Sequence, residues 1–448
     1  MASPTNPSTQ AMFSGLFKEV YIDSGVVDLV PNATKLVKEV PFEKGQEIGD
    51  KFIVPVVMSD EAGVTYAVAG AGNFAVGGAV GLQMQKVAVD GSQMILQSAI
   101  DNESIARAQK GGKSAFQNAT QLKVKNVLST GKKRLEISMW YGQSGLGIIE
   151  SKANVDGTHE TIVITAASWA PLIWVGKRNA KLLVYQGTTQ IGSSAGTDDD
   201  STNVFWIDSV NVATRTITVH GASGDITALN SASTSSPAVL TVYFNKSVTG
   251  SGGTFAHQDQ LGLDQQLVQA TGNKFGVSVV TYDLWAGNSY DSLSGALTFS
   301  KLMAAINLAV NRGLDSDVKA WISNETWKGL LNDQAALRKY DGSYDPKKME
   351  NGASELVFHG VSGKVTVVAT GYLKGGDAFI LPMDELMRIG AADFAFTAPG
   401  AGGLDGSAGD IFFVDPSYAG YLFRAYSHQQ VLNLAPQKSV KVINVVNS

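Results

Sequence analysis

A run of small and apolar residues, from Gly63 to Gly81, constrains this chain more than any other part of its sequence. It reads GVTYAVAGAGNFAVGGAVG and lies between two segments that predict strands, residues 51–58 and 82–89. The second segment alternates apolar with polar or small residues, which is the period of a half-buried strand. We therefore predict an extended β-hairpin with a glycine-rich tip. A hairpin of this length is marginally stable alone in water, so it needs another chain to pack on.

The tip of this hairpin is the segment that we expect to contact a neighbouring subunit. Glycine lets two backbones approach closely and adapt to slightly different surroundings. The residues assigned to this contact are Gly70, Gly72, Phe74, Gly77 and Gly78.

Composition favours a folded protein that shares its surface with neighbours. The chain has 448 residues, which suggests two or three folding units. Only 17% of residues are charged and 48 are glycine, while the net charge of −5 marks no general nucleic-acid binder. The absence of cysteine excludes disulfides and cysteine-ligated metal sites. An ordinary β-rich soluble domain is the alternative interpretation.

The first 50 residues predict a flexible tail and an extended arm. Residues 1–14 are rich in Ser, Thr, Pro and Asn, and residues 15–50 hold only short apolar pieces. The start of the chain does not have the pattern of a secretory signal, and no apolar run is long enough to span a bilayer. We expect a soluble product made in a cytoplasm.

Residues 101–142 predict a long helix with a small-residue face. Asp101 and Asn102 are candidate N-caps, and Gly131 predicts a break followed by a second helical piece. The other face is basic, which indicates either a solvated surface or an electrostatic contact with a polyanion or an acidic neighbour. The candidate residues for that contact are Lys110, Lys113, Lys123 and Lys125.

The remainder predicts an all-β unit followed by a mixed α/β unit. Short strands separated by Gly, Ser, Thr, Asn and Asp turns fill residues 158–257, which we interpret as an insertion. Residues 298–312 form the strongest amphipathic helix pattern of the chain, with Gly313 as its C-cap. Several short strands follow it.

No group of residues predicts catalysis, a metal site or a cofactor. The five histidines are scattered along the sequence, without a paired metal-ligand motif. Asp198, Asp199 and Asp200 lie in a Ser/Gly/Thr loop that indicates solvated carboxylates, with a weak calcium site as the alternative. The glycine-rich run has no GK[ST] ending, and the G-x-S-x-G spacing fails because residue 146 is Leu. We predict no enzymatic activity.

The order of these parts resembles the major capsid proteins of tailed bacteriophages, with the Hong Kong 97-type fold. The segments ALTFSKLMAAINLAVNRGLDSDVKAWISNETWKGL and GYLFRAYSHQQVLNLAPQKSVKVINVV also resemble this family, the second as its returning peripheral strand. The resemblance implies an α+β fold with five parts. They are an N-terminal arm (1–50), an extended β-hairpin loop (51–100), a spine helix of the peripheral domain (101–157), an inserted all-β domain (158–257), and an axial domain with the rest of the peripheral domain (258–448).

The resemblance also implies a function and partners. The expected role is a major capsid protein that assembles as hexamers and pentamers into an icosahedral head shell around phage double-stranded DNA. The expected partners are a separate scaffolding protein, a portal and a decoration protein, with non-specific DNA contacts and no membrane. The protein would reside in the virion after assembly in the cytoplasm of a bacterial host. Covalent cross-linking through Lys86 or Lys132 is not predicted, because no residue match supports it.

Three alternatives remain open at this point. An enzyme would need a convergent set of polar residues. A tail-tube, tail-sheath or decoration protein would suit the β-rich unit, but not a long helix after a hairpin. An encapsulin-type compartment shell would share the fold and differ in its cargo.

Overall fold

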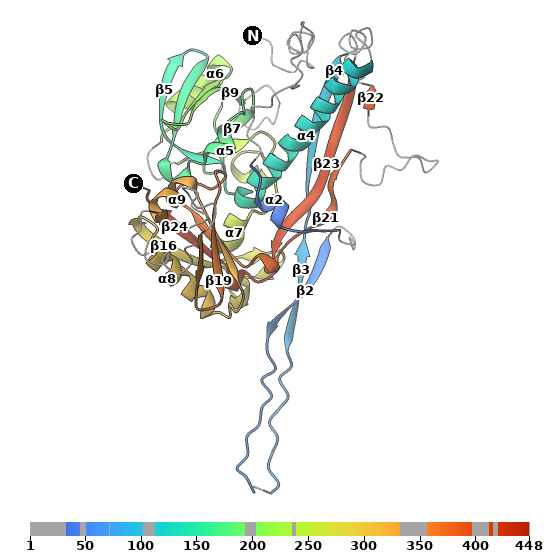
Figure 1. The fold of residues 1–448 in the computed structure, drawn as a ribbon, viewed down its shortest axis with the longest axis vertical. Coiled ribbons are helices and arrows are strands. Elements are labelled where there is room, and N and C mark those ends of the chain that lie inside the picture. Colours follow the sequence, from blue (N-terminus) through green and yellow to red (C-terminus); the bar gives the residue numbers. More distant parts are fainter. Residues whose placement is uncertain are drawn as a thin grey trace, which may run out of the picture.

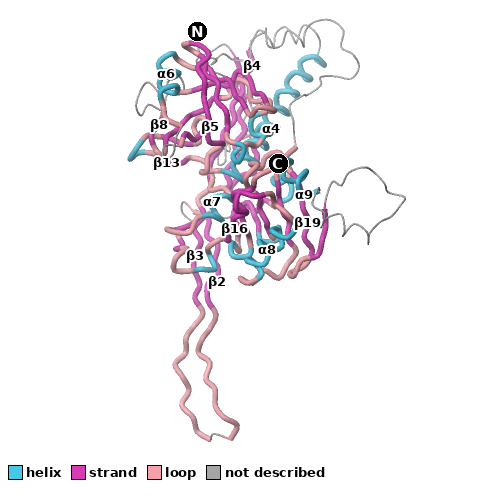
Figure 2. Tube along the Cα trace, turned by 90° about the vertical axis from the view of Figure 1, so that its left-hand side faces the viewer, coloured by secondary structure: helices cyan, strands magenta, loops and turns pink. Residues whose placement is uncertain are grey.

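The computed structural model describes residues 33–44, 51–70, 72–101, 113–192, 203–234, 239–331, 356–396, 412–414 and 420–447. Figure 1 shows three packed parts around one long helix, with a hairpin that projects far beyond them. Figure 2 shows the same projection from the side. Within the described residues, no helix has both the length and the hydropathy needed to cross a membrane.

A six-stranded sheet forms the part nearest the C-terminus. Its strand order is β16 (Asn288–Gly295), β24 (Val440–Val445), β20 (Ala378–Leu381), β17 (Val318–Ile322), β19 (Lys364–Ala369) and β18 (Leu356–His359). Helix α8 (Phe299–Val310) covers it and α9 (Asn324–Leu331) follows β17. Thr298 caps α8 by accepting a hydrogen bond from the Lys301 N–H, and Leu302 and Ile306 are fully buried against the sheet. The amphipathic helix predicted over residues 298–312 is therefore present.

A second sheet runs beside the long helix. It contains β1 (Phe42–Lys44), β21 (Leu386–Ala395), β23 (Gly420–Asn433) and β22 (Phe412–Val414), while β4 (Ser92–Asp101) pairs with the other side of β23. The closing segment, expected to form one returning strand, is divided between the two sheets. β23 lies in this sheet and β24 lies in the six-stranded one, because the single turn of η7 (Pro436–Lys438) redirects the chain between them.

The third part is a closed barrel. Its strands follow the order β11 (Leu240–Phe244), β5 (Gly147–Asp156), β6 (His159–Ile164), β10 (Thr216–His220), β9 (Phe205–Asn211), β7 (Lys181–Gln186) and β8 (Thr189–Gln190). Because β11 also pairs with β7, the sheet closes on itself and leaves few free edges. The barrel begins at Gly147, so the predicted boundary at residue 158 is wrong. β5 is mostly exposed and its burial does not alternate beyond the first few residues, which hid it in the sequence.

The long helix α4 (Lys113–Tyr141) is continuous. Asp101 ends strand β4 instead of capping a helix, and the break predicted at Gly131 is absent. A Cβ at Gly131 would lie 2.7 Å from the ring of Phe394, so this glycine serves a close packing contact with β21. Residues 102–112, which include Lys110, lie outside the described residues.

Buried ion pairs lie where the three parts meet. Lys441 of β24 pairs with Asp264 of α7 (Leu263–Val268) and, at 3.3 Å, with Asp377. Lys374 donates from Nζ to the carbonyl of Gly145 at 3.0 Å, at the start of the barrel. Truncating one partner of such a cluster leaves an uncompensated buried charge, so its members hold the parts in one arrangement.

The part of the N-terminal arm that the structure describes is tied to its own subunit. A single helical turn, α2 (Leu36–Glu39), lies on α4, and β1 pairs in parallel with β21. The carboxylate of Glu136, fully buried on α4, accepts hydrogen bonds from the backbone N–H groups of Leu36 at 3.0 Å and Val37 at 2.8 Å. These are the unpaired donors at the start of α2, and a carboxylate suits them electrostatically.

We predict that Glu136→Gln releases this anchor. The amide keeps one acceptor oxygen but places N–H donors against backbone donors, so α2 should lose about 1.5–3 kcal/mol of docking free energy. Hydrogen exchange of residues 33–44 should become at least tenfold faster while the exchange of α8 is unchanged. The matched control is Glu150→Gln, an exposed carboxylate that pairs with Arg215 at 3.0 Å. Equal protection of the arm in both variants would contradict this role of Glu136.

Candidate assembly surfaces

The predicted β-hairpin is present, and its two ends differ in character. β2 (Phe52–Ser59) pairs with β3 (Gln83–Val89) at the root. There Phe52, Val87 and Val89 are buried in a core that also contains Val277 and Trp285. Beyond the root, residues 60–70 and 72–82 continue as two extended limbs. The root therefore fixes the direction of the limbs, and the limbs themselves lie clear of the body (Figures 1 and 2).

The limbs continue antiparallel, in the register that begins at the pair Ser59 and Gln83, one residue shifted from the root. The Ala62 N–H donates to the Val80 carbonyl at 3.1 Å, and the Gly77 N–H donates to Thr65 Oγ1 at 2.8 Å. Continued by one residue per step, this register places Tyr66 opposite Val76. Residues that oppose each other across two extended strands point to the same face.

One face of the limbs is therefore bulky and apolar, and the other is small. The bulky face consists of Val64, Tyr66, Val68, Phe74, Val76, Val80 and Leu82, each 44–91% exposed. The residues between them are Gly, Ala, Thr and Asn, and no charged residue occurs from position 62 to position 85. Soluble monomers rarely expose a contiguous apolar surface of this kind, which marks a site of protein interaction.

The residues predicted at the tip have distinct positions in the hairpin. Gly70 and Gly72 both have positive φ, +84° and +64°, and form the reversal where only glycine is unstrained. Phe74 is 53% exposed on the bulky face. Gly77 and Gly78 lie on the returning limb, and a Cβ at Gly78 would meet no other atom. Their contact with a neighbouring subunit stays a prediction.

The candidate basic residues of α4 do not act as one group. Lys125 is exposed, whereas Lys123 is partly buried and donates to the Ala99 carbonyl of β4. Burial lowers the pKa of Lys123 to about 8. Lys113 begins α4, but its side chain and the whole of Lys110 lie outside the described residues.

A second basic group was not visible in the sequence, because its members come from separate segments. Burial, together with the charges of Arg134 and Lys133, lowers the pKa of Lys177 to about 7. The Arg134 guanidinium lies 3.2 Å above the ring of Phe244, at the end of β11. This cluster joins α4 to the barrel.

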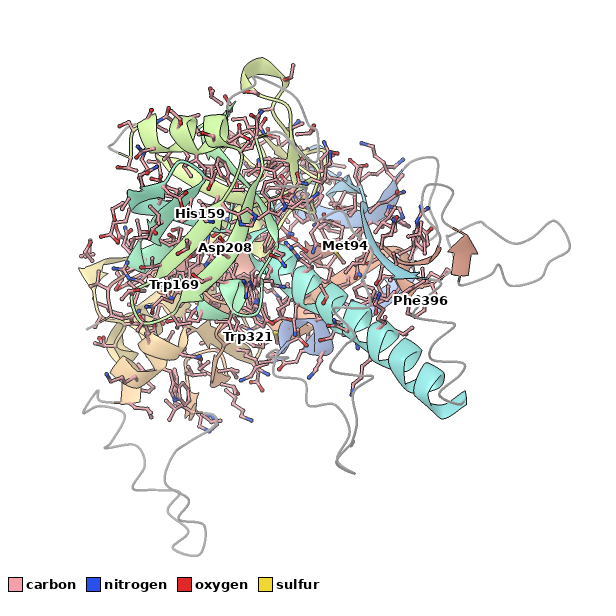
Figure 3. All side chains as sticks on the ribbon, turned by 90° about the horizontal axis from the view of Figure 1, so that it is seen from above. Met94, His159, Trp169, Asp208, Trp321 and Phe396 are labelled. Atoms are coloured by element: carbon pink, nitrogen blue, oxygen red, sulfur yellow. The ribbon has the colours of Figure 1, made fainter. Side chains whose placement is uncertain are left out.

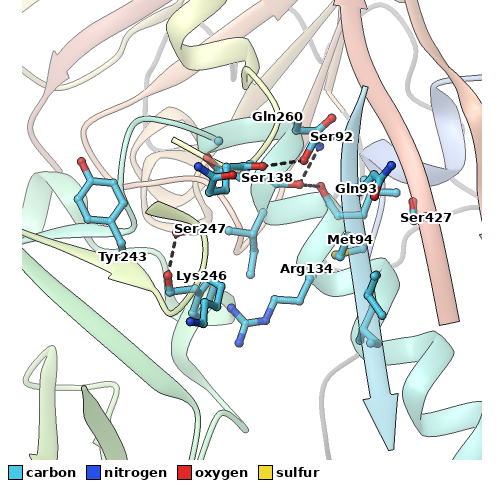
Figure 4. A pocket seen from close by; sticks show the side chains of 18 of the residues that line it. Ser92, Gln93, Met94, Arg134, Ser138, Tyr243, Lys246, Ser247, Gln260 and Ser427 are labelled. Carbon is cyan, nitrogen blue, oxygen red and sulfur yellow. Dashed lines mark hydrogen bonds between the residues drawn. The ribbon is translucent and has the colours of Figure 1, made fainter. Parts of the chain in front are cut away.

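Figure 4 shows the cavity that Arg134 enters, between β4, α4 and the barrel. It has a volume of about 450 Å³, and its wall includes the backbone edge of β4 that faces away from β23. Polar contacts cross its floor, where Gln260 Nε2 donates to Ser138 Oγ at 2.7 Å. Among the described residues this edge of β4 pairs with no strand, and an edge of that kind beside apolar side chains is a surface to which an extended segment can add.

A row of acids and histidines crosses the barrel surface. His159 and His220 are direct partners in the register of β6 and β10, and Asp208 bonds to both, at 3.3 Å and 2.8 Å (Figure 3). The sequence showed no such group because these residues are far apart along the chain. They are bonded to one another, and in the described part of the chain no three histidine, aspartate or glutamate side chains are placed to hold a metal ion.

Asp259 lies at the junction between the barrel and α4. Its Oδ2 accepts the Gln143 N–H at 3.3 Å, while its buried Oδ1 has no hydrogen-bond partner. Burial raises the pKa of Asp259 to about 7, against an ordinary value near 3.8. A carboxyl whose pKa is raised on folding opposes folding increasingly as the pH rises from the unfolded value to the folded one.

We predict that Asp259→Asn removes this pH dependence. The neutral amide mimics the protonated carboxyl, so both proteins should be equally stable near pH 4. Above pH 7 the variant should be more stable, by an upper limit of roughly 4 kcal/mol. Chemical denaturation between pH 4 and pH 8 measures the difference, with Asp90→Asn as the exposed control. A stability difference that does not grow with pH would contradict the assignment.

Comparisons with known proteins give structural similarity only. No family model matches the chain, and no curated protein matches its sequence. The fold is similar to the capsid subunit of cyanophage A-1(L), with 11% identity, 98% coverage of both chains and a TM-score of 0.49. It is also similar to the capsid of a native GTA particle, with 8% identity, coverage of 99% and 100%, and a TM-score of 0.45. The encapsulin of Synechococcus elongatus gives 9% identity, coverage of 94% and 92%, and a TM-score of 0.37.

Proposed function

We propose that this chain is the major capsid protein of a tailed-phage-like particle, a structural subunit that assembles into an icosahedral shell around double-stranded DNA. One observation carries the proposal. The base of the hairpin is packed into a core, while the uncharged, apolar face of its limbs is exposed and projects away from the rest of the subunit. Such a face is stable in water only when another molecule covers it. A second copy of the chain is the partner that is always present at equal concentration.

The energetics of the hairpin favour assembly. Burying one Val, Leu or Phe side chain is worth roughly 1.5–3 kcal/mol. Association costs an estimated 4–15 kcal/mol in lost translational and rotational freedom. The seven bulky residues of the limbs together are therefore sufficient to offset this cost, and every subunit in a shell both donates a hairpin and receives one.

The remaining parts of the proposal follow from this role. Hexamers and pentamers would close the shell, with a scaffolding protein, a portal and a decoration protein as further partners. Exposed basic residues such as Lys125 would meet packaged DNA without sequence preference. The protein would then belong to the virion, assembled in the cytoplasm of its bacterial host, and would have a structural role without catalysis.

The alternative with the same geometry is an encapsulin-type compartment shell. Its hairpin would perform the same task, so the contents of the particle decide between the two. Nuclease-resistant DNA in purified particles supports the capsid, and a protein cargo supports the compartment.

We predict that Val68→Asp combined with Val76→Asp prevents assembly. Two carboxylates on the bulky face would have to be buried unpaired, which costs several kcal/mol per contact. The wild-type chain, alone or with its scaffold, should sediment as large particles that show five-fold and six-fold units by electron microscopy. The variant should remain a folded, dispersed subunit, and deletion of residues 63–81 should have the same effect.

The control is Val280→Asp, at a position that is 69% exposed but lies outside the limbs. It should assemble like the wild type. Normal particles from the doubly substituted chain or from the deletion would show that the hairpin does not hold the shell together. A wild-type chain that stays monomeric under all assembly conditions would refute the proposed function.

A further inference from the structure

Four buried charged residues form a cluster where α7, β24 and the start of β20 meet. Nζ of Lys441 on β24 contacts Oδ1 of Asp264 on α7 directly, and it lies 3.3 Å from Oδ1 of Asp377, the residue before β20. Lys374, the fourth member, interacts electrostatically with both acids. One amine therefore has two carboxyl groups within reach.

The reacting groups of this cluster are shielded from water. Lys441 and Asp264 are each only 8% exposed. Lys441 lies opposite Phe379 in the register of β20 and β24, between the fully buried Val440 and Val442. A site without bulk water leaves an amine and a carboxyl poorly solvated, and it protects an amide between them from hydrolysis.

The two acids of the cluster differ in their protonation. Burial raises the pKa of Asp377, so this carboxyl holds a proton more readily than Asp264 does. The pKa of Asp264 is lowered despite its burial, because the positive charges of Lys441 and Lys374 lie beside it. Carboxyl groups whose environments push their pKa values apart are suited to different roles in one reaction.

We propose that Lys441 and Asp264 condense to an amide that links β24 to α7 within one subunit. A proton first passes from the Lys441 ammonium to the Asp264 carboxylate, which leaves a neutral amine beside a neutral acid. Nζ then attacks Cγ of Asp264, while Asp377 accepts a proton from the nitrogen and donates one to the carboxyl group. The C–O bond breaks, water leaves, and Asp377 returns to its initial state. One positive and one negative charge disappear together, so the net charge is unchanged.

The placement of the two groups supplies what the reaction lacks in free solution. There an amine and a carboxylic acid remain an ammonium and a carboxylate, which do not condense. Groups held in contact on packed elements can react with effective molarities of roughly 10⁵–10⁸ M. The amide also removes two buried charges whose desolvation is costly, and it leaves Lys374 with Asp377 as its counter-ion.

The bond would close a large loop inside the subunit. Its two residues are 177 positions apart, and the chain has no cysteine with which a disulfide could make such a link. A covalent link over this separation restricts the unfolded chain and so stabilises the folded one. Because the link does not join subunits, it is independent of the proposed shell and can be tested on the unassembled protein.

Mass spectrometry of the purified subunit tests the proposal. We expect the intact mass to be lower than the mass of the sequence by one water molecule. Trypsin should release a branched peptide in which residues 247–274 are joined to residues 439–448, with cleavage after Lys441 blocked. An undiminished mass, with residues 247–274 and 442–448 released as separate peptides, would overturn the proposal.

Lys441→Arg separates the bond from the ion pair. Arginine keeps the positive charge but stays protonated, so it cannot form this amide. The variant should have its full mass, and on a denaturing gel it should migrate more slowly than the wild type, whose closed loop keeps the denatured chain compact. The matched control is Lys438→Arg, at a surface lysine that pairs with Asp315 at 3.1 Å and with Glu385 at 3.3 Å. This control should retain the branched peptide.

Asp377→Asn tests the proton transfer. The variant keeps both reacting groups but lacks the carboxyl that exchanges protons with them, so bond formation should be about a hundredfold slower or more. The branched peptide is quantified in samples taken over time after cell-free synthesis, and circular dichroism shows whether the variant is folded. Wild-type speed in a folded Asp377→Asn chain would refute the role of Asp377. If this variant does not fold, the intact mass of the wild type decides, and a negative result there leaves the proposed shell untouched.

Discussion

The apolar face of the hairpin is the constraint on which the rest of this structure depends. A chain can bury an apolar face against its own core, lack such a face, or expose it for contact with another molecule. Here the limbs hold no charge between positions 62 and 85, and the root is locked into a core with Trp285 and Val277. The body therefore cannot fold back to cover its own hairpin without breaking that core. The exposed face is a fixed feature of the subunit, and it is the observation behind the proposal that the chain is a component of an assembly.

A projecting hairpin can reach a defined site on a neighbour only if the body of the subunit that carries it is rigid. One hydrophobic core runs through the barrel, the end of α4 and the six-stranded sheet, and it includes Ile164, Trp140 and Phe379. The buried pairing of Lys441 with Asp264 and Asp377 adds to this connection. Glu136 anchors the described part of the N-terminal arm to helix α4 by accepting hydrogen bonds from the start of α2. Asp259 is the exception, since one oxygen of its buried carboxyl has no hydrogen-bond partner and burial raises its pKa to about 7, so we expect the junction with the barrel to depend on pH. A change of pH around 7 is therefore expected to alter the stability of the barrel junction.

The sequence predicted those features that depend on local pattern. The hairpin, the long helix, the α8 stripe and the strand-rich barrel all follow from periodicity and turn residues. The register of the limbs was also readable in principle, because Tyr66 and Val68 alternate with small residues as Phe74 and Val76 do. The errors arose from packing partners that a sequence does not display. Gly131 faces Phe394, which lies more than 260 residues away, and strand β5 is recognisable only through its partners β6 and β11. The same reason hid the row of His159, Asp208 and His220.

Hydrogen exchange of the hairpin in the free and the assembled protein tests the central claim most directly. In the free subunit, the amides of residues 62–70 and 72–82, as far as the structure describes them, have few hydrogen-bond partners and should exchange within seconds. In assembled particles they should be protected by at least a hundredfold, while the amides of α8 exchange at the same rate in both states. Particles in which residues 62–82 exchange as fast as in the free subunit would contradict the account, because the apolar face would then still be open to water.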